Sequence, residues 1–156
     1  MENIEAKKAW LKDGYTPKLA ELKPDAARLW GKMNVQQMIE HMADYVRIAS
    51  GRTPMETVTP EEHLPKMQAF LQSEKPFREN TPNALMPETP PEPRHPATTE
   101  AIEELQNELQ YLFDTYTANP ALVLANPFFG ELGFDMQVQL LHKHAWHHLR
   151  QFGIAE

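Results

Sequence analysis

Residues 133–152 read GFDMQVQLLHKHAWHHLRQF, and this stretch predicts a long helix that Gly153 ends. At 100° per residue, one face of this helix carries most of the apolar side chains, and His144 lies at its edge. That face is formed by Val138, Leu141, Ala145, His148, Leu149 and Phe152. The same projection places three side chains away from the core: Lys143, Trp146 and Arg150. The stretch therefore predicts a helix packed by one face, with histidines at the edge of that face.

Two of these histidines, His144 and His148, are four residues apart, so their imidazoles lie about 6 Å from each other on one side of a helix. This spacing allows both rings to bind one metal ion, which needs at least three protein ligands. His41 is the best third candidate, because it borders the apolar stripe of another predicted helix. The remaining candidates are poorer because of their positions: His63, His95 and His142. The alternative interpretation is a hydrogen-bonded helix end without a metal, and the spacing alone does not decide between the two.

The remaining sequence predicts further helices and no strand. Asn34 and Gln37 form a capping box for a helix that runs to Ser50, where Gly51 ends it. A second helix begins near Thr98 or Thr99 and ends before Pro120. The N-terminal part is helical from Ile4 to Leu11, is interrupted at Gly14 and restarts at Pro17. Residues 126–130, Asn-Pro-Phe-Phe-Gly, form a turn.

Ten of the fourteen prolines lie between Gly51 and Ala97, so this region cannot form one long helix or a central strand. One short helix fits within it, at Leu64 to Gln72. We expect this segment to pack over the bundle through a series of apolar side chains: Leu64, Met67, Phe70, Leu71 and Phe77. The predicted fold is all-α, with residues 1–156 in a single domain. It is a four-helix bundle in which residues 51–97 are a Pro-rich crossover between helices 2 and 3.

Composition excludes several classes of function. The net charge of −7, without any basic run, argues against a nucleic-acid surface. The chain has no cysteine, so it has neither disulfides nor thiolate metal ligands. No apolar run approaches the ~20 residues that span a bilayer. Since the N-terminal residues also lack a secretion signal, we expect a cytoplasmic protein.

Several stretches together resemble one family, the DinB/YfiT-like metal-dependent helical bundles. They are Trp30-Gly31-Lys32-Met33, Gln37-Met38 with His41-Met42, Pro65-Lys66-Met67 with Phe70-Leu71, Asn126-Pro127-Phe128-Phe129-Gly130, and His144 to Gly153. The chain is most similar to a subfamily of small four-helix-bundle proteins to which no activity is assigned. The resemblance implies His41, His144 and His148 as ligands of nickel or zinc. The chain departs from the pattern at Asn126, where near relatives are expected to carry His.

Other branches of this superfamily carry out transfer and isomerisation reactions with low-molecular-weight thiols. Only analogy supports assigning such an activity to this chain. The chain has only Ser50 and Ser73 as serines, and no HExxH motif, so an external nucleophile is needed. The hypothesis is a metal-dependent transferase or hydrolase that activates a thiol or water toward an unidentified small molecule. The alternatives are a non-catalytic protein that binds a metal or small ligand, and a bundle with a purely structural metal.

The sequence suggests a role for three further residues near the predicted site but does not decide it. Tyr45 lies one turn beyond His41 and could donate a hydrogen bond to a bound group. Gln151 could orient that group, and His147 is interpreted as a neighbour of the ligands or a surface residue, not as a ligand. An outward-facing Trp146 and the family resemblance predict a homodimer.

Overall fold

The N-terminal segment forms one continuous helical rod, consisting of α1 (Ile4–Ala9), the π-turn η1 (Trp10–Gly14) and α2 (Tyr15–Ala20). Its buried side chains repeat strictly every four residues: Lys7, Leu11, Tyr15 and Leu19. An α-helix repeats every 3.6 residues, so this spacing would drift around a regular helix, and the wider π-turn removes part of the drift. The predicted interruption at Gly14 is therefore wrong, because the helix widens there instead of ending.

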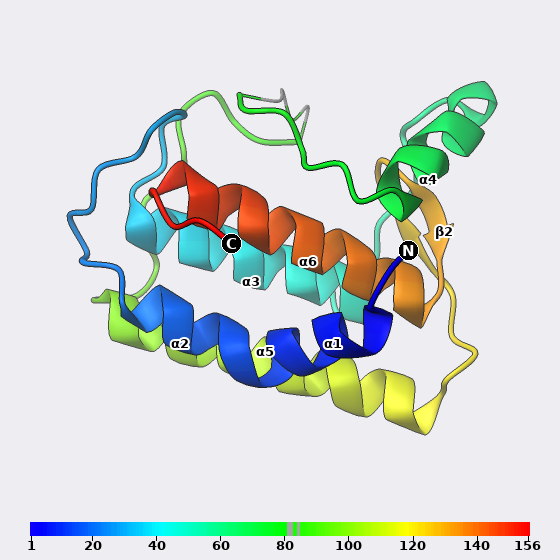
Figure 1. The fold of residues 1–156 in the computed structure, drawn as a ribbon, viewed down its shortest axis with the longest axis horizontal. Helices are drawn as coiled ribbons and strands as arrows, with labels where there is room; N and C mark the ends of the chain where they lie inside the picture. Colours follow the sequence, from blue (N-terminus) through cyan, green and yellow to red (C-terminus); the bar gives the residue numbers. More distant parts are fainter. Residues whose placement is uncertain (81–82, 84) are drawn as a thin grey trace.

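Three longer helices follow this rod in the chain: α3 (Val35–Ser50), α5 (Thr98–Ala118) and α6 (Phe134–Gln151) (Figure 1). The rod packs against α5 and α6, and α3 packs against the same two helices. The predicted capping box of α3 is present, since Asn34 accepts from the Gln37 amide and the Gln37 side chain accepts from the Asn34 amide. Gly51 ends α3 in the left-handed region, at φ +85° and ψ +1°. The main hydrophobic core includes residues from all these helices, and the prediction of a mostly helical fold is confirmed.

The crossover contains the short 3-10 helix η2 (Glu61–His63) and helix α4 (Leu64–Gln72), which has the predicted bounds. Leu71 is fully buried in a second apolar cluster beside the main core. Phe129, Leu132 and Leu140 are buried with it, and Met67, Phe70 and Phe77 pack against them. Parts of the crossover are therefore held against the body of the protein, as expected from its apolar side chains.

The region around the predicted turn is a small β-hairpin, in which β1 (Leu124–Asn126) pairs antiparallel with β2 (Gly130–Leu132). The turn is confirmed, and the prediction that the chain has no strand is wrong. Strands of three residues are too short to show alternation in the sequence. The side-chain oxygen of Asn126 accepts hydrogen bonds from the amides of Phe128 and Phe129, at 2.9 and 3.1 Å. Asn126 therefore holds the turn that follows it.

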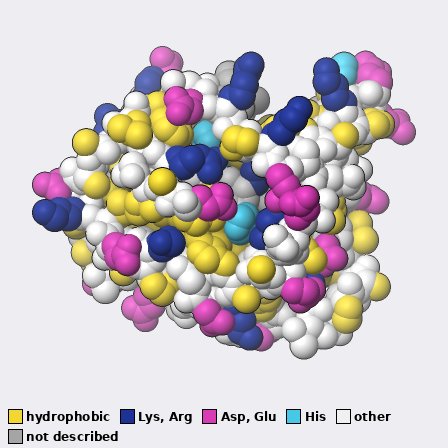
Figure 2. Space-filling view, viewed as in Figure 1, with side chains coloured by type: hydrophobic (Ala, Val, Ile, Leu, Met, Phe, Trp, Pro, Cys, Tyr) yellow, Lys and Arg dark blue, Asp and Glu magenta, His cyan; other side chains and the backbone are white. Residues whose placement is uncertain are grey.

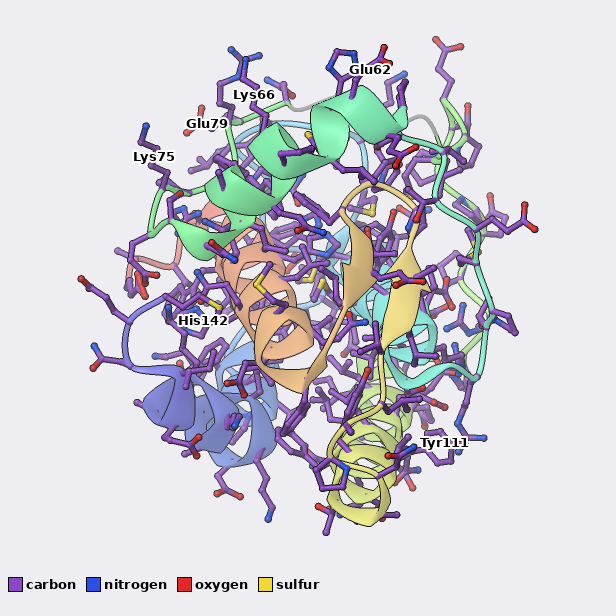
Figure 3. The ribbon with its side chains drawn as sticks, turned by 90° about the vertical axis from the view of Figure 1, so that its right-hand side faces the viewer. Glu62, Lys66, Lys75, Glu79, Tyr111 and His142 are labelled. Atoms are coloured by element: carbon purple, nitrogen blue, oxygen red, sulfur yellow. The ribbon has the colours of Figure 1, made fainter. Side chains whose placement is uncertain are left out.

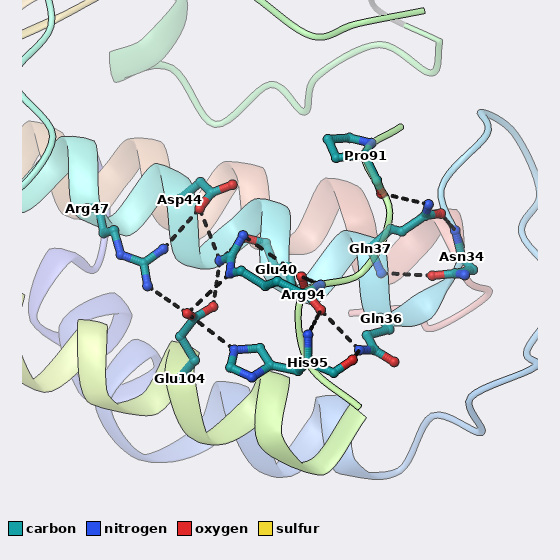
Figure 4. Close-up of polar contacts among 10 residues, drawn as sticks. All are labelled: Asn34, Gln36, Gln37, Glu40, Asp44, Arg47, Pro91, Arg94, His95 and Glu104. Atoms are coloured by element: carbon teal, nitrogen blue, oxygen red, sulfur yellow. Dashed lines mark hydrogen bonds and ion pairs between the residues drawn. The ribbon is translucent and has the colours of Figure 1, made fainter. Parts of the chain in front are cut away.

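Polar contacts fasten the end of the crossover to α3 and α5 (Figure 4). Glu40 is buried, and its two oxygens accept from the backbone amides of Arg94 and His95 at 2.7 and 3.4 Å. The Arg94 guanidinium reaches Glu104 at 2.5 Å, and Glu104 also pairs with Arg47 at 2.8 Å. Burial opposes ionisation of Glu104, but hydrogen bonds from Arg94, Arg47 and His95 lower its pKa to about 2.

Two side chains of α6 lie differently from the prediction. Trp146 is only 6% exposed and stacks on Trp10 with ring centroids 5.1 Å apart, and Lys143 is 7% exposed. The prediction that they face away from the core is wrong because α6 contacts α1, α3, α4 and β2, so more than one face is covered. Trp146 therefore gives no support to the predicted dimer.

The structure is a computed structural model that describes residues 1–80, 83 and 85–156. Within these residues, no helix combines the length and the apolar character needed to cross a membrane.

Candidate metal centre

Three imidazoles meet where α3 faces α6, and they belong to the three residues predicted from the sequence. The Nε2 atom of His144 lies 3.1 Å from Nε2 of His41 and 2.9 Å from Nε2 of His148. Two nitrogens bound 2.0–2.1 Å from one ion lie about 2.9–3.4 Å apart at octahedral or tetrahedral angles. His41, His144 and His148 therefore lie close enough to hold one metal ion.

The protein surroundings keep these imidazoles uncharged. Burial, followed by the nearby His147, lowers the pKa of His41 to about 4. Burial, and after it the neighbouring histidines, also lowers the pKa values of His144 and His148 well below the usual range. A divalent cation binds the neutral form of imidazole, so all three rings are ready for a metal at neutral pH without losing protons.

A hydrogen-bonded chain fixes which nitrogen of His148 carries its proton. The Gln151 amide nitrogen donates to the Trp30 carbonyl at 2.9 Å, so the Gln151 oxygen faces His148. That oxygen lies 2.8 Å from Nδ1 of His148 and can only accept a hydrogen bond. Nδ1 therefore carries the proton, and Nε2 presents a lone pair to the other two imidazoles. Gln151 orients the imidazole itself, whereas the sequence suggested that it orients a bound group.

Gly31 lies directly against this chain of hydrogen bonds. Its φ is +79°, and a Cβ at this position would lie 2.5 Å from the amide nitrogen of Gln151. The loop is also tied to the end of α6, since the Leu29 amide donates to the Gln151 carbonyl at 2.7 Å. The positive φ favours glycine here, and an added Cβ would push the Gln151 amide away from the Trp30 carbonyl. The sequence contained the signal, a Trp-Gly pair, but gave no indication of its partner.

Tyr45 and Asn83 form a polar pair beside the imidazoles. The ring of Tyr45 lies 4.8 Å from that of His41 and 4.9 Å from that of His144, centroid to centroid. The Asn83 amide donates to the Tyr45 oxygen at 2.7 Å, so the phenol proton can be donated to another acceptor. Burial raises the pKa of Tyr45, which keeps that proton in place at neutral pH. Asn83 is a site residue that sequence reasoning missed.

The imidazoles form part of the wall of a cavity of about 540 Å³. This volume lies within the range of small-molecule sites. The crossover and the hairpin turn supply much of the apolar wall, including Met67, Phe77, Met86, Phe128 and Phe129. His147 also lines the cavity, with its ring 5.0 Å from that of His148. The site is therefore an accessible, mostly apolar chamber with three nitrogen donors in its wall.

The other histidines are placed outside this group. The His95 ring lies 3.3 Å from a carboxylate oxygen of Glu104. His63 is exposed next to Glu62, and His142 packs edge-on against Trp10 at 5.2 Å. Asn126, the position that departs from the family pattern, uses its side-chain oxygen to accept the two backbone hydrogen bonds of the hairpin turn.

Comparison of this chain with family models, with curated proteins and with solved structures found no match. The resemblance to the DinB/YfiT-like bundles therefore stays a prediction.

Proposed function

We propose that the chain binds one divalent metal ion, zinc or nickel, through His41, His144 and His148 in a bundle of the DinB/YfiT-like type. We further propose that it is a metal-dependent enzyme, a transferase or hydrolase acting on a small molecule with an external thiol or water. The observation that supports this most is the meeting of three Nε2 atoms in the wall of a cavity large enough for a substrate. When bound, such an ion acts as a Lewis acid and favours the ionised form of a thiol or water.

The side chains of this protein do not supply an activated serine or cysteine, so we propose that the nucleophile is an external thiol or water. Both serine hydroxyls donate to backbone carbonyls at helix ends, Ser50 to Arg47 at 3.2 Å and Ser73 to Phe70 at 2.6 Å. Within the cavity, the aromatic and methionine side chains exclude water from a small substrate. The Tyr45 hydroxyl, oriented by Asn83, supplies a hydrogen-bond donor next to His41 and His144. These features favour an active or ligand-binding site over a purely structural metal.

The number of donors also argues against a structural metal. In the described part of the chain, the group able to hold an ion consists of these three histidines without a fourth ligand. Structural zinc sites are closed by four protein ligands, whereas catalytic sites keep a position open. A non-catalytic protein that binds a small ligand at the metal shares this open position. It remains the second candidate, and measured turnover would separate the two.

Metal content tests the ligand set directly. Protein stripped with a chelator and reloaded with zinc or nickel should contain one ion per chain by elemental analysis. His144→Ala and His148→Ala should each reduce this to a small fraction, because two imidazoles bind far more weakly than three. His147→Ala is the matched control, since it removes a neighbouring imidazole on the same helix, and it should retain one ion. Full occupancy in His144→Ala or His148→Ala would disprove the assignment.

Cobalt loading tests the open position. Adding a low-molecular-weight thiol to the cobalt form should produce a sulfur-to-cobalt charge-transfer band. The His148→Ala variant should show no such band. If neither thiols nor other anions change the spectrum of the loaded protein, the open-site proposal is wrong and the metal is structural.

A further inference from the structure

A second hollow, of about 170 Å³, is lined mainly by residues of three parts of the chain. These are α1, α6, and the segment that directly follows α4. The hollow shares no lining residue with the chamber that holds the imidazoles. Four basic side chains line it: Lys7, Lys75, Lys143 and Arg150. Figure 2 shows this face, where basic and acidic side chains surround a histidine between α1 and α6. Figure 3 shows His142 beside the N-terminal helix, with Lys75 on the segment above it.

Positive charge exceeds negative charge around this hollow. Only two acidic side chains line it, Glu74 and Glu156. Glu74 is bound to Lys7 at 2.6 Å, and no ion pair joins the other three cations to a carboxylate among the described residues. Such an excess is unexpected in a chain whose net charge is −7.

Among these cations, Lys143 has a strong need for compensating charge, because its side chain is buried. Its ammonium donates to the carbonyls of Ser73 and Lys75 and lies 4.7 Å from the centroid of the Phe70 ring. These contacts use two of its three N–H groups and supply no negative charge. The ammonium of Lys7, also buried, is bound to Glu74 and to the Gln139 oxygen at 2.8 Å, which leaves it one N–H as well. Glu74 is the carboxylate whose charge acts on the Lys143 ammonium, but it is bound directly to Lys7, so two buried ammonium groups share one negative charge. A second anion in the hollow would lower the cost of burying them.

We propose that this hollow binds a small oxyanion, the phosphate or carboxylate group of a small molecule. The remaining N–H groups of Lys7 and Lys143 meet the anion at the base of the hollow. Arg150 adds a planar guanidinium, which binds two oxygens at once, and Lys75 adds a charge at the exposed rim. This site is independent of the metal, because neither its residues nor its charge involve the three imidazoles.

The experiment is a titration of isotope-labelled protein with inorganic phosphate and, separately, with acetate, at constant ionic strength. Saturable NMR shifts are expected at the Gln139 side-chain amide and the Trp146 indole, which line the hollow. Arg150→Gln and Lys75→Gln should each weaken binding about tenfold, since each removes a charge-assisted contact. Lys66→Gln is the matched control, because this exposed lysine of α4 lies outside the hollow, and it should bind as the original protein does (Figure 3).

The two titrations also identify the ligand class. Saturation by phosphate alone assigns a phosphate group, by acetate alone a carboxylate, and by both a general oxyanion site. Bound anion should also raise the melting temperature of the original protein more than that of Arg150→Gln. If neither anion gives saturable shifts, or if Arg150→Gln and Lys75→Gln bind as tightly as Lys66→Gln, the proposal is overturned.

Discussion

Helix α3 carries two polar clusters that begin one residue apart and differ in how their charges are compensated. The carboxylate cluster, around Glu40 and Glu104, has its oxygens filled by backbone amides and guanidinium groups (Figure 4). The imidazole cluster, around His41, contains three groups of one kind whose Nε2 atoms face one another. A cluster in which donors match acceptors fastens chain segments together. A cluster of converging imidazole nitrogens has no such match of donors and acceptors, and the proposed metal ion would supply the missing partner.

The largest expected difference between the two clusters is in how each makes the free energy of unfolding depend on pH. A histidine with a lowered pKa is neutral in the folded protein, so the unfolded chain takes up more protons below about pH 6.5. The free energy of unfolding of metal-free protein should therefore fall as the pH drops from 6.5 toward 4, by about 1.4 kcal/mol per pH unit for each buried histidine. The stability from Glu104 is present above pH 4.5 and is lost only as the pH falls toward 2.

Urea unfolding at a series of pH values measures this dependence. His144→Leu should reduce the slope between pH 6.5 and 5 by about 1.4 kcal/mol per pH unit, because one buried imidazole is gone. His63→Leu, which removes an exposed histidine, should leave the slope unchanged. A stability that stays constant from pH 7 to pH 5 would contradict the buried, uncharged imidazoles.

Breaking the carboxylate cluster should affect stability and leave metal binding intact. Glu40→Ala deprives the Arg94 and His95 amides of their acceptor, and we expect a loss of about 2–3 kcal/mol in the free energy of unfolding. Glu103→Ala, on the exposed side of α5, should change it by less than about 0.5 kcal/mol. Chemical denaturation gives both values, and elemental analysis should still find one ion in each variant. Loss of the metal in Glu40→Ala would mean that the two clusters depend on each other.

The smallest effect is expected from the groups that position His148. Gln151→Leu should weaken metal binding about 10–100-fold, because the imidazole loses the acceptor for its Nδ1 proton. Gly31→Ala should act in the same direction by displacing Gln151. Gly153→Ala is the matched control, since its φ of +86° gives the same backbone strain but no atom lies within 4 Å of the added Cβ. Competition with a chromogenic chelator measures the affinity, and equal values for the two glycine variants would rule out the steric argument.

Local signals in the sequence predicted more than long-range ones. The capping box at Asn34 and the short helix at Leu64–Gln72 were predicted because their signals lie within a few residues. Spacing predicted the pairing of His144 with His148, and a position at the border of an apolar stripe added His41. The approach of Gly31 to Gln151 was not predictable, because it joins segments 120 residues apart whose contact depends on the complete fold.

The errors on α6 have a related cause. A helical projection assumes one buried face, but this helix is covered on several sides, so Trp146 and Lys143 are buried. Asn83 was missed because an asparagine in a Pro-rich segment carries no periodic signal. Its contact with Tyr45 follows from the path of the crossover over the chamber.

The π-turn at Trp10–Gly14 makes the N-terminal helix sensitive to a change in its length. Each residue of a helix advances by about 100°, so deleting one residue within the turn would rotate α1 by that angle relative to α2. Leu19 could then stay in the core while Lys7 turned away from Glu74 and Gln139. Trp10 would also leave its place over Gly14, where its ring lies 2.8 Å from the position of a Cβ. A substitution in this rod leaves the direction of its other side chains unchanged, but a single deletion would turn every side chain of α1 by about 100° relative to those of α2.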